Sequence, residues 1–155
     1  MRYRYWASAV ASIILGLVFI FSGVGKLLHQ IDFLNILLNN SFLTTFLAHV
    51  VAYALPWAEL ILGALLIAGI SVKLMASLSA VIVAGFVASN SWLIAQGRIY
   101  EPCGCFGVFE KLVMGELSTI ESLIFDIVMF ALLLVILFCY PGKFFETRFW
   151  FSRKK

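Results

Sequence analysis

The stretch that decides the fold is the first apolar run, residues 6–28, which reads WASAVASIILGLVFIFSGVGKLL. It contains no charged residue before Lys26. A helix of about 20 apolar residues is long enough to cross the roughly 30 Å hydrocarbon core of a bilayer. Because the run exceeds the roughly 7–15 apolar residues of a signal peptide, and because more such runs follow, we expect a retained membrane helix rather than a cleaved leader.

Three further apolar runs follow, and the four predicted spans cover about residues 6–28, 46–70, 74–96 and 118–140. Of the 155 residues, 63% are hydrophobic and only 12% are charged, which leaves too little polar surface for a soluble domain of this length. Inside lipid, only α-helices and closed β-barrels satisfy all backbone hydrogen-bonding groups. We therefore predict an all-α, polytopic membrane protein, a four-transmembrane-helix bundle forming a single domain over residues 1–155. The basic residues lie at the edges of the apolar runs, so no nucleic-acid partner is expected.

The segments between the spans carry helix signals of their own. Residues 30–40 break the apolar pattern, and Asp32 is a candidate cap for a short interfacial helix between the first two spans. Pro56 lies inside the second run, so we expect a kink there or a late helix start near Tyr53. Residues 118–121, Ser-Thr-Ile-Glu, have the form of a capping box at the start of the fourth span.

Small residues at four-residue spacing predict two close-packed helix faces. One ladder lies in the first span and the other in the third. Their members are Ser8, Ser12 and Gly16, and Ala76, Ala80, Ala84 and Ala88.

The distribution of Lys and Arg predicts the orientation. Four spans put eight of the 11 basic residues on the side of the termini: Arg2, Arg4, Lys73, Lys143, Arg148, Arg153, Lys154 and Lys155. The other side has Lys26, Arg98 and Lys111. By the positive-inside rule, both termini of this inner (plasma) membrane protein are cytoplasmic and the loop of residues 97–117 lies on the outer side. Disulfides persist in that compartment.

The outer loop contains Cys103 and Cys105, which are separated by Gly104. A disulfide between them would close a tight, strained ring, and strained, accessible disulfides exchange readily. The alternative is a static disulfide or two thiols without a role. A fixed link across one residue constrains almost no chain, which favours redox or metal chemistry. Cys139 lies near the inner end of the fourth span, about 30 Å from the outer face, so it cannot pair with either cysteine in a monomer and we interpret it as a small apolar residue.

Three polar residues fall within apolar runs: Glu59, Asn90 and Asp126. The predicted topology puts all of them in the outer halves of their helices. Ionisable groups at membrane depth usually face a bundle interior or a cavity, so we expect a polar pocket beneath the cysteine loop. The alternative is that Glu59 and Asp126 are wetted at the interface or paired with Lys26.

Two histidines, His29 and His49, also fall on the outer side. Together with Cys103 and Cys105 they would make a two-Cys, two-His ligand set that zinc accepts. Their spacing matches no compact zinc-finger pattern, and each histidine alone is more often an interfacial side chain than a ligand.

Three segments resemble a known family. FSGVGKL at residues 21–27 resembles the Gly…Lys-Leu signature of DoxX-like membrane proteins, and PWAELILG at residues 56–63 resembles their Pro-x-x-Glu-x-x-x-Gly segment. CGCFG at residues 103–107 is similar to the Cys-x-Cys-Phe-Gly loop of the MauE branch, named for methylamine utilisation. The motifs occur in the family's order, and the resemblance covers about residues 10–140.

The resemblance implies a four-helix membrane bundle associated with periplasmic thiol–disulfide chemistry, as in the maturation of methylamine dehydrogenase to which MauE is linked. Such bundles are compared with vitamin K epoxide reductase and the quinone-linked disulfide formers. This chain has Cys-x-Cys instead of Cys-x-x-Cys and lacks a second outer cysteine pair. Direct exchange with a thioredoxin-like partner is therefore easier to support than a self-contained relay. Other DoxX relatives are subunits of quinone-reducing complexes, so the resemblance also makes a quinone a candidate cofactor.

The resulting hypothesis is a thiol–disulfide oxidoreductase that exchanges electrons with an extracytoplasmic thioredoxin-like or substrate protein through Cys103 and Cys105. Glu59, Asn90 and Asp126 would serve as proton donors or as ligands of a quinone head group. Two alternatives stay open. One is a soft-metal (Zn or Cu) binding or handling protein, and the other is a non-catalytic assembly subunit of a membrane redox complex.

Overall fold

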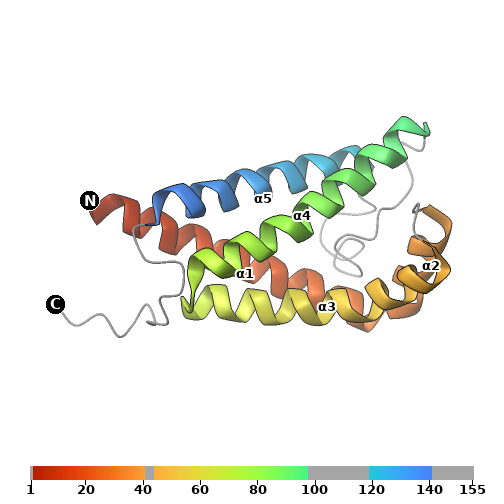
Figure 1. Cartoon of the computed structure of the whole chain (residues 1–155), viewed down its shortest axis with the longest axis horizontal. Coiled ribbons are helices and arrows are strands. Elements are labelled where there is room, and N and C mark those ends of the chain that lie inside the picture. Colours follow the sequence, from red (N-terminus) through yellow and green to blue (C-terminus); the bar gives the residue numbers. More distant parts are fainter. Residues whose placement is uncertain (1, 41–43, 98–118, 141–155) are drawn as a thin grey trace.

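A computed structural model describes residues 2–40, 44–97 and 119–140 of the chain. The expectations for Cys103, Cys105 and the 97–117 loop, and the Ser118 end of the capping box, therefore lie outside the described residues, apart from Gly97. The described elements are all helices (Figure 1): α1 (Arg2–Leu28), α2 (Gln30–Asn40), α3 (Thr45–Ala68), α4 (Val72–Ala95) and α5 (Thr119–Cys139).

Four of these helices are long and apolar enough to cross a membrane: Trp6–Leu28, Thr45–Ala68, Val72–Ala95 and Thr119–Cys139. Their ends agree with the predicted spans to within two residues. The described part of the chain contains no strand, and α2 is the short helix expected between the first two spans. The prediction of an all-α, polytopic membrane protein is confirmed, and its environment is the lipid bilayer.

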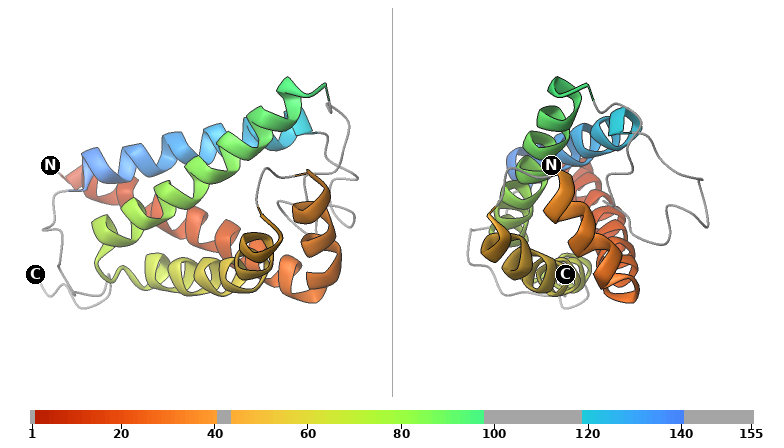
Figure 2. Two further views of the ribbon diagram at one scale, coloured as in Figure 1. Left: turned by 45° about the vertical axis from the view of Figure 1, so that its right-hand side comes forward. Right: turned by 90° about the vertical axis from the view of Figure 1, so that its right-hand side faces the viewer.

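The four long helices associate as two pairs. α1 lies along α3 and α4 lies along α5, while α1 also packs against α5 and joins the pairs. α2 packs mainly against α3 and caps one end of the bundle (Figures 1 and 2). The end of α4 and the start of α5 lie at this α2 end, whereas the start of α1 and the end of α5 lie at the opposite end (Figure 1). The central core contains Leu15, Phe19, Leu66, Val83 and Leu133.

Glycines allow the backbones of α1 and α3 to approach closely. A Cβ added to Gly63 would lie 2.7 Å from the carbonyl oxygen of Gly16, and a Cβ added to Gly16 would lie 2.7 Å from that of Gly63. Further along α1, a Cβ on Gly23 would lie 2.9 Å from the carbonyl oxygen of Pro56. No larger residue fits at these crossings without moving a helix, so the three glycines fix how deeply α1 and α3 interlock.

For the second span we expected either a kink at Pro56 or a late helix start near Tyr53. α3 starts at Thr45 and continues through Pro56, so the late start near Tyr53 is wrong. Ala48 and Ala52 in its first two turns are fully buried, because this part of α3 packs against α2. Packing by neighbouring helices compensates for the hydrogen bond that a proline removes inside a membrane helix.

The two small-residue ladders differ in outcome. Ser8 and Ser12 are fully buried and Gly16 contacts α3, which confirms the first. In the second, Ala76 is buried but Ala84 and Ala88 are exposed, so the predicted seam is wrong over its second half. A spacing of four residues drifts by about 40° per step around a helix of 3.6 residues per turn. The buried face of α4 instead mixes steps of three and four: Val72, Ala76, Ser79, Val83, Asn90 and Leu93.

Candidate functional site

The side chain at the centre of the candidate site is Lys26, which lies near the end of α1 and is fully buried. Its ammonium group donates a hydrogen bond of 2.6 Å to Oε1 of Glu59 on α3. It donates a second bond of 2.9 Å to Oγ of Ser22, one turn earlier on α1. A buried ammonium group is tolerated only when it is paired and hydrogen-bonded, and this one is both.

Two aromatic rings complete the surroundings of Lys26. Its Nζ lies 4.5 Å from the ring centroid of Phe86 on α4 and 5.5 Å from that of Phe33 on α2. Both distances are within the range in which a cation is attracted to an aromatic ring. Phe33 is itself buried, so α2 contributes to the site by covering the ammonium group from the end of the bundle. Side chains from four helices therefore surround this one charge.

A second polar pair lies on the opposite pair of helices. Nδ2 of Asn90 on α4 donates a hydrogen bond of 2.8 Å to Oδ2 of Asp126 on α5. Both side chains are buried, each with 2% of its surface exposed. Asn90 lies about one and a half helical turns, and Asp126 about two turns, from the α2 end of its helix, in the half predicted for the polar pocket. Glu59 lies just past the middle of α3, so its predicted place in the outer half of its helix is wrong.

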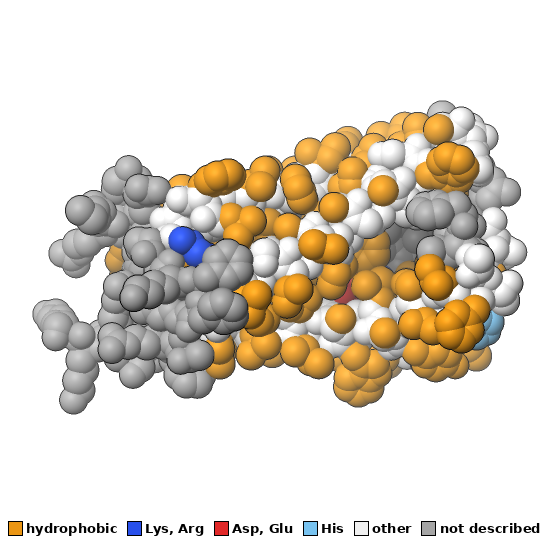
Figure 3. Space-filling model, viewed as in Figure 1, with side chains coloured by type: hydrophobic (Ala, Val, Ile, Leu, Met, Phe, Trp, Pro, Cys, Tyr) orange, Lys and Arg blue, Asp and Glu red, His pale blue; other side chains and the backbone are white. Residues whose placement is uncertain are grey.

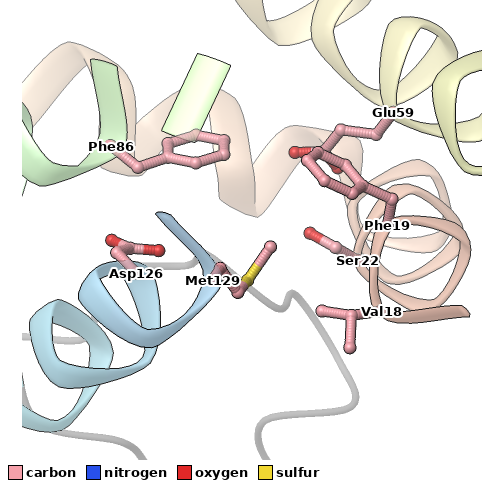
Figure 4. A pocket seen from close by; sticks show the side chains of 7 residues that line it. All are labelled: Val18, Phe19, Ser22, Glu59, Phe86, Asp126 and Met129. Carbon is pink, nitrogen blue, oxygen red and sulfur yellow. The ribbon is translucent and has the colours of Figure 1, made fainter. Parts of the chain in front are cut away.

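A small cavity separates the two pairs (Figure 4). It is lined by Val18, Phe19, Ser22, Glu59, Phe86, Asp126 and Met129. Its volume, taken as the space open to the centre of a water molecule, is about 10 Å³, which is room for roughly one water. Within the described residues, Oε2 of Glu59 has no hydrogen-bond partner, although Oε1 is paired with Lys26. On the face shown in Figure 3, hydrophobic side chains cover the middle of the bundle and a carboxylate is visible only at depth.

Sequence reasoning identified three members of this site. Glu59, Asn90 and Asp126 are all buried, Asn90 bonds Asp126, and Glu59 and Asp126 border the same cavity. The alternative in which Glu59 pairs with Lys26 also holds, but the pair lies inside the bundle and is not wetted. Ser22 was missed. The feature that could have identified it is its position in the FSGVGKL segment, four residues before Lys26 and therefore on the same face of the helix.

The interpretation of Lys26 as a charge at the outer face is wrong. Hydropathy places it at the edge of an apolar run, but Phe33 of α2 and Phe86 of α4 lie over its ammonium group and the side chain is fully buried. A buried lysine does not count toward the positive-inside rule, which considers loops and helix ends. Without Lys26, the difference in the number of Lys and Arg residues between the two predicted faces is larger. The predicted orientation then rests on the other ten basic residues.

The two histidines do not gather with other ligands in the described residues. Both are exposed: Nδ1 of His29 is hydrogen-bonded to Asp32 at 3.0 Å, and Nδ1 of His49 donates to the carbonyl oxygen of Thr45 at 2.8 Å. Asp32 lies inside the first turn of α2, so it is not the cap of that helix. No group of three His, Cys, Asp or Glu side chains that could hold a metal ion occurs in the described ranges. Cys103 and Cys105, the other members of the zinc hypothesis, lie outside them.

The third cysteine fits its expected structural role. Cys139 is a free thiol of intermediate burial at the last residue of α5. It lies about 30 Å along the helix from Thr119, at about 1.5 Å per residue. Cys139 is therefore at the opposite end of the bundle from α2 and from the buried polar pairs.

Comparison with known proteins shows which family this chain belongs to. The profile described as methylamine utilisation protein MauE matches residues 4–139. No curated protein and no solved structure gives a significant match. The matched range begins at the third residue of α1, contains the other four described helices in full and includes the segment with Cys103 and Cys105.

Proposed function

The chain belongs to the MauE family of multi-pass membrane proteins, and from this premise we propose that it is a thiol–disulfide redox protein whose reactive groups are Cys103 and Cys105. One observation carries the proposal: a Cys-Gly-Cys sequence lies in the segment that links α4 to α5. The described ends of those two helices lie at the α2 end of the bundle (Figure 1). Asn90 and Asp126 lie near the same ends of α4 and α5.

The chemistry is a thiol–disulfide exchange with a second protein. The thiolate of one cysteine attacks a disulfide of the partner, forms a mixed disulfide and releases one partner thiolate. The second cysteine attacks the mixed disulfide, which closes the Cys103–Cys105 disulfide and releases the other partner thiolate. The partner gains two electrons and this chain loses two. The reverse sequence transfers them the other way.

The partner is proposed to be an extracytoplasmic thioredoxin-like or cysteine-containing protein. The excess of basic residues on the side of the termini supports a cytoplasmic location for the termini by the positive-inside rule. The segment with Cys103 and Cys105 would then lie on the outer side. Exchange in that compartment is reasonable because disulfides persist there.

We extend the proposal to a quinone as the electron acceptor, with its head-group oxygens held by Glu59, Asn90 and Asp126. Their burial supports this extension, together with the cavity that Glu59 and Asp126 both border and the hydrogen bond between Asn90 and Asp126. The cavity beside them has room for roughly one water, so a head group would have to displace Phe86 or separate α3 from α4. A quinone-reduction assay with Glu59→Gln tests this part. Turnover equal to that of the unmodified protein removes Glu59 from quinone binding.

The exchange itself is tested by trapping the mixed disulfide. In a variant with Cys103→Ser or Cys105→Ser, the remaining thiol can be captured by the partner but cannot be released by the missing cysteine. Non-reducing electrophoresis of membranes should show a dithiothreitol-sensitive adduct for at least one single variant and none for the double variant. Cys139→Ser is the matched control and should behave like the unmodified chain. Adduct-free membranes for both single variants would refute the exchange.

A further inference from the structure

The buried polar cluster has an unequal number of positive and negative groups. Its titratable members are Lys26 on α1, Glu59 on α3 and Asp126 on α5, each at least 98% buried. The groups that face them from the remaining helices are Phe33 on α2 and Phe86 and Asn90 on α4, none of which titrates. With all three titratable groups ionised, the described part of the bundle interior would carry one unbalanced negative charge.

An unbalanced charge in an apolar interior is strongly disfavoured, and the usual outcome is that the group becomes neutral. One proton on either carboxylate would neutralise the cluster. The hydrogen bonds favour Asp126 as the group that takes it. The Lys26 ammonium donates to Glu59 at 2.6 Å, which favours the ionised form of Glu59. Asp126 instead accepts a hydrogen bond from the neutral amide of Asn90, at its Oδ2 atom.

The geometry also supplies a route between the two acids. Glu59 and Asp126 border the same cavity, on opposite sides of it (Figure 4). Oε2 of Glu59 is fully buried and has no hydrogen-bond partner among the described residues. The cavity has room for roughly one water, which could donate to that oxygen and accept from a protonated Asp126.

We propose that Glu59 and Asp126 form a buried one-proton site, in which Asp126 holds the proton while Glu59 is paired with Lys26. The ligand of this site is a proton, carried across the cavity by a water molecule. The proposal depends on the charges and the cavity alone, so it stands or falls separately from the exchange at Cys103 and Cys105.

Infrared spectroscopy of the full chain in lipid nanodiscs at neutral pH tests the site, because a protonated carboxylic acid has a carbonyl stretch that a carboxylate lacks. The unmodified protein should show one such band. Asp126→Asn should remove it. Glu59→Gln should also remove it, because Asp126 then becomes the only acid that balances Lys26. Lys26→Met should double the band, because both acids are then neutral.

Asp32→Asn is the matched control, since it makes the same chemical change at an exposed position and should leave the band unchanged. Loss of the Asp126 band from the Glu59→Gln variant is a result that a purely structural role for these side chains would not produce. The Glu59→Gln and Lys26→Met spectra are read independently, so failure of one variant to fold leaves the other as a test. A band that persists in Glu59→Gln, or that is absent from the unmodified protein, overturns the proposal.

Discussion

Substitution of Gly63 by alanine is the sharpest test of the helix packing. In the structure, an alanine Cβ at this position would lie 2.7 Å from the carbonyl oxygen of Gly16 and 2.9 Å from Cγ1 of Ile20. The first contact is with backbone, which cannot rotate away as a side chain can. Ordinary contact begins at 3.4 Å, so α1 and α3 would have to separate by about 0.7 Å at this crossing.

Gly85→Ala on α4 is the matched control, because a Cβ there meets nothing within 4 Å. Both substitutions replace a glycine in a helix interior, where alanine is favoured by about 0.5–1 kcal/mol. This gain is common to both variants and cancels in their comparison. The remaining difference is the cost of overpacking a tight interface, which is about 1–3 kcal/mol. Gly63→Ala should therefore be less stable than Gly85→Ala by that amount.

The free energy of unfolding can be measured by titrating the full chain from a mild detergent into a denaturing one, with helix content followed by circular dichroism. Gly16→Ala provides a second reading of the same contact from the other helix, since its Cβ would lie 2.7 Å from the carbonyl oxygen of Gly63. If Gly63→Ala and Gly16→Ala unfold at the same detergent composition as Gly85→Ala, the close approach of α1 and α3 is wrong.

Three further outcomes are expected. Lys26→Met should lower the free energy of unfolding by up to about 3–5 kcal/mol, because it removes one partner of a buried ion pair. Adding Glu59→Gln should recover part of the loss in the same detergent titration, and two strictly additive losses would contradict the pairing. Asn90→Leu should cost about 1–3 kcal/mol by leaving Oδ2 of Asp126 without its donor, and an unchanged midpoint would argue against that hydrogen bond. Cys139→Ser should leave the disulfide content of the protein unchanged in a thiol-labelling assay, and a change would give Cys139 a redox role.

Most of the fold could be predicted because it depends on local properties of the sequence. Four apolar runs long enough to cross a bilayer have few alternatives to helices, and their ends follow from where polar residues begin. The pairing of the helices depends on which faces meet, and here the sequence was less informative. Ala84 and Ala88 share the spacing of a packing seam with Ala76, but α4 turns them outward.

The candidate site could be predicted in part for the same reason. A carboxylate or amide inside an apolar run signals burial by its cost, which identified Glu59, Asn90 and Asp126. Lys26 lies at the end of a run, where a lysine normally extends its amino group to the interface. In the structure it is covered by Phe33 of α2 and Phe86 of α4, and no local pattern in the sequence shows those contacts.

The proposed function depends above all on Cys103 and Cys105 forming a redox pair. The most direct measurement is mass spectrometry of the alkylated full-length protein after equilibration in a series of dithiothreitol and oxidised dithiothreitol mixtures. We expect two alkyl groups per chain to be lost together as the mixture becomes more oxidising, with both sites in the peptide containing Cys103 and Cys105. Cys139 should be labelled independently of this transition. A pair that remains fully alkylated across the whole series would contradict the proposed redox function.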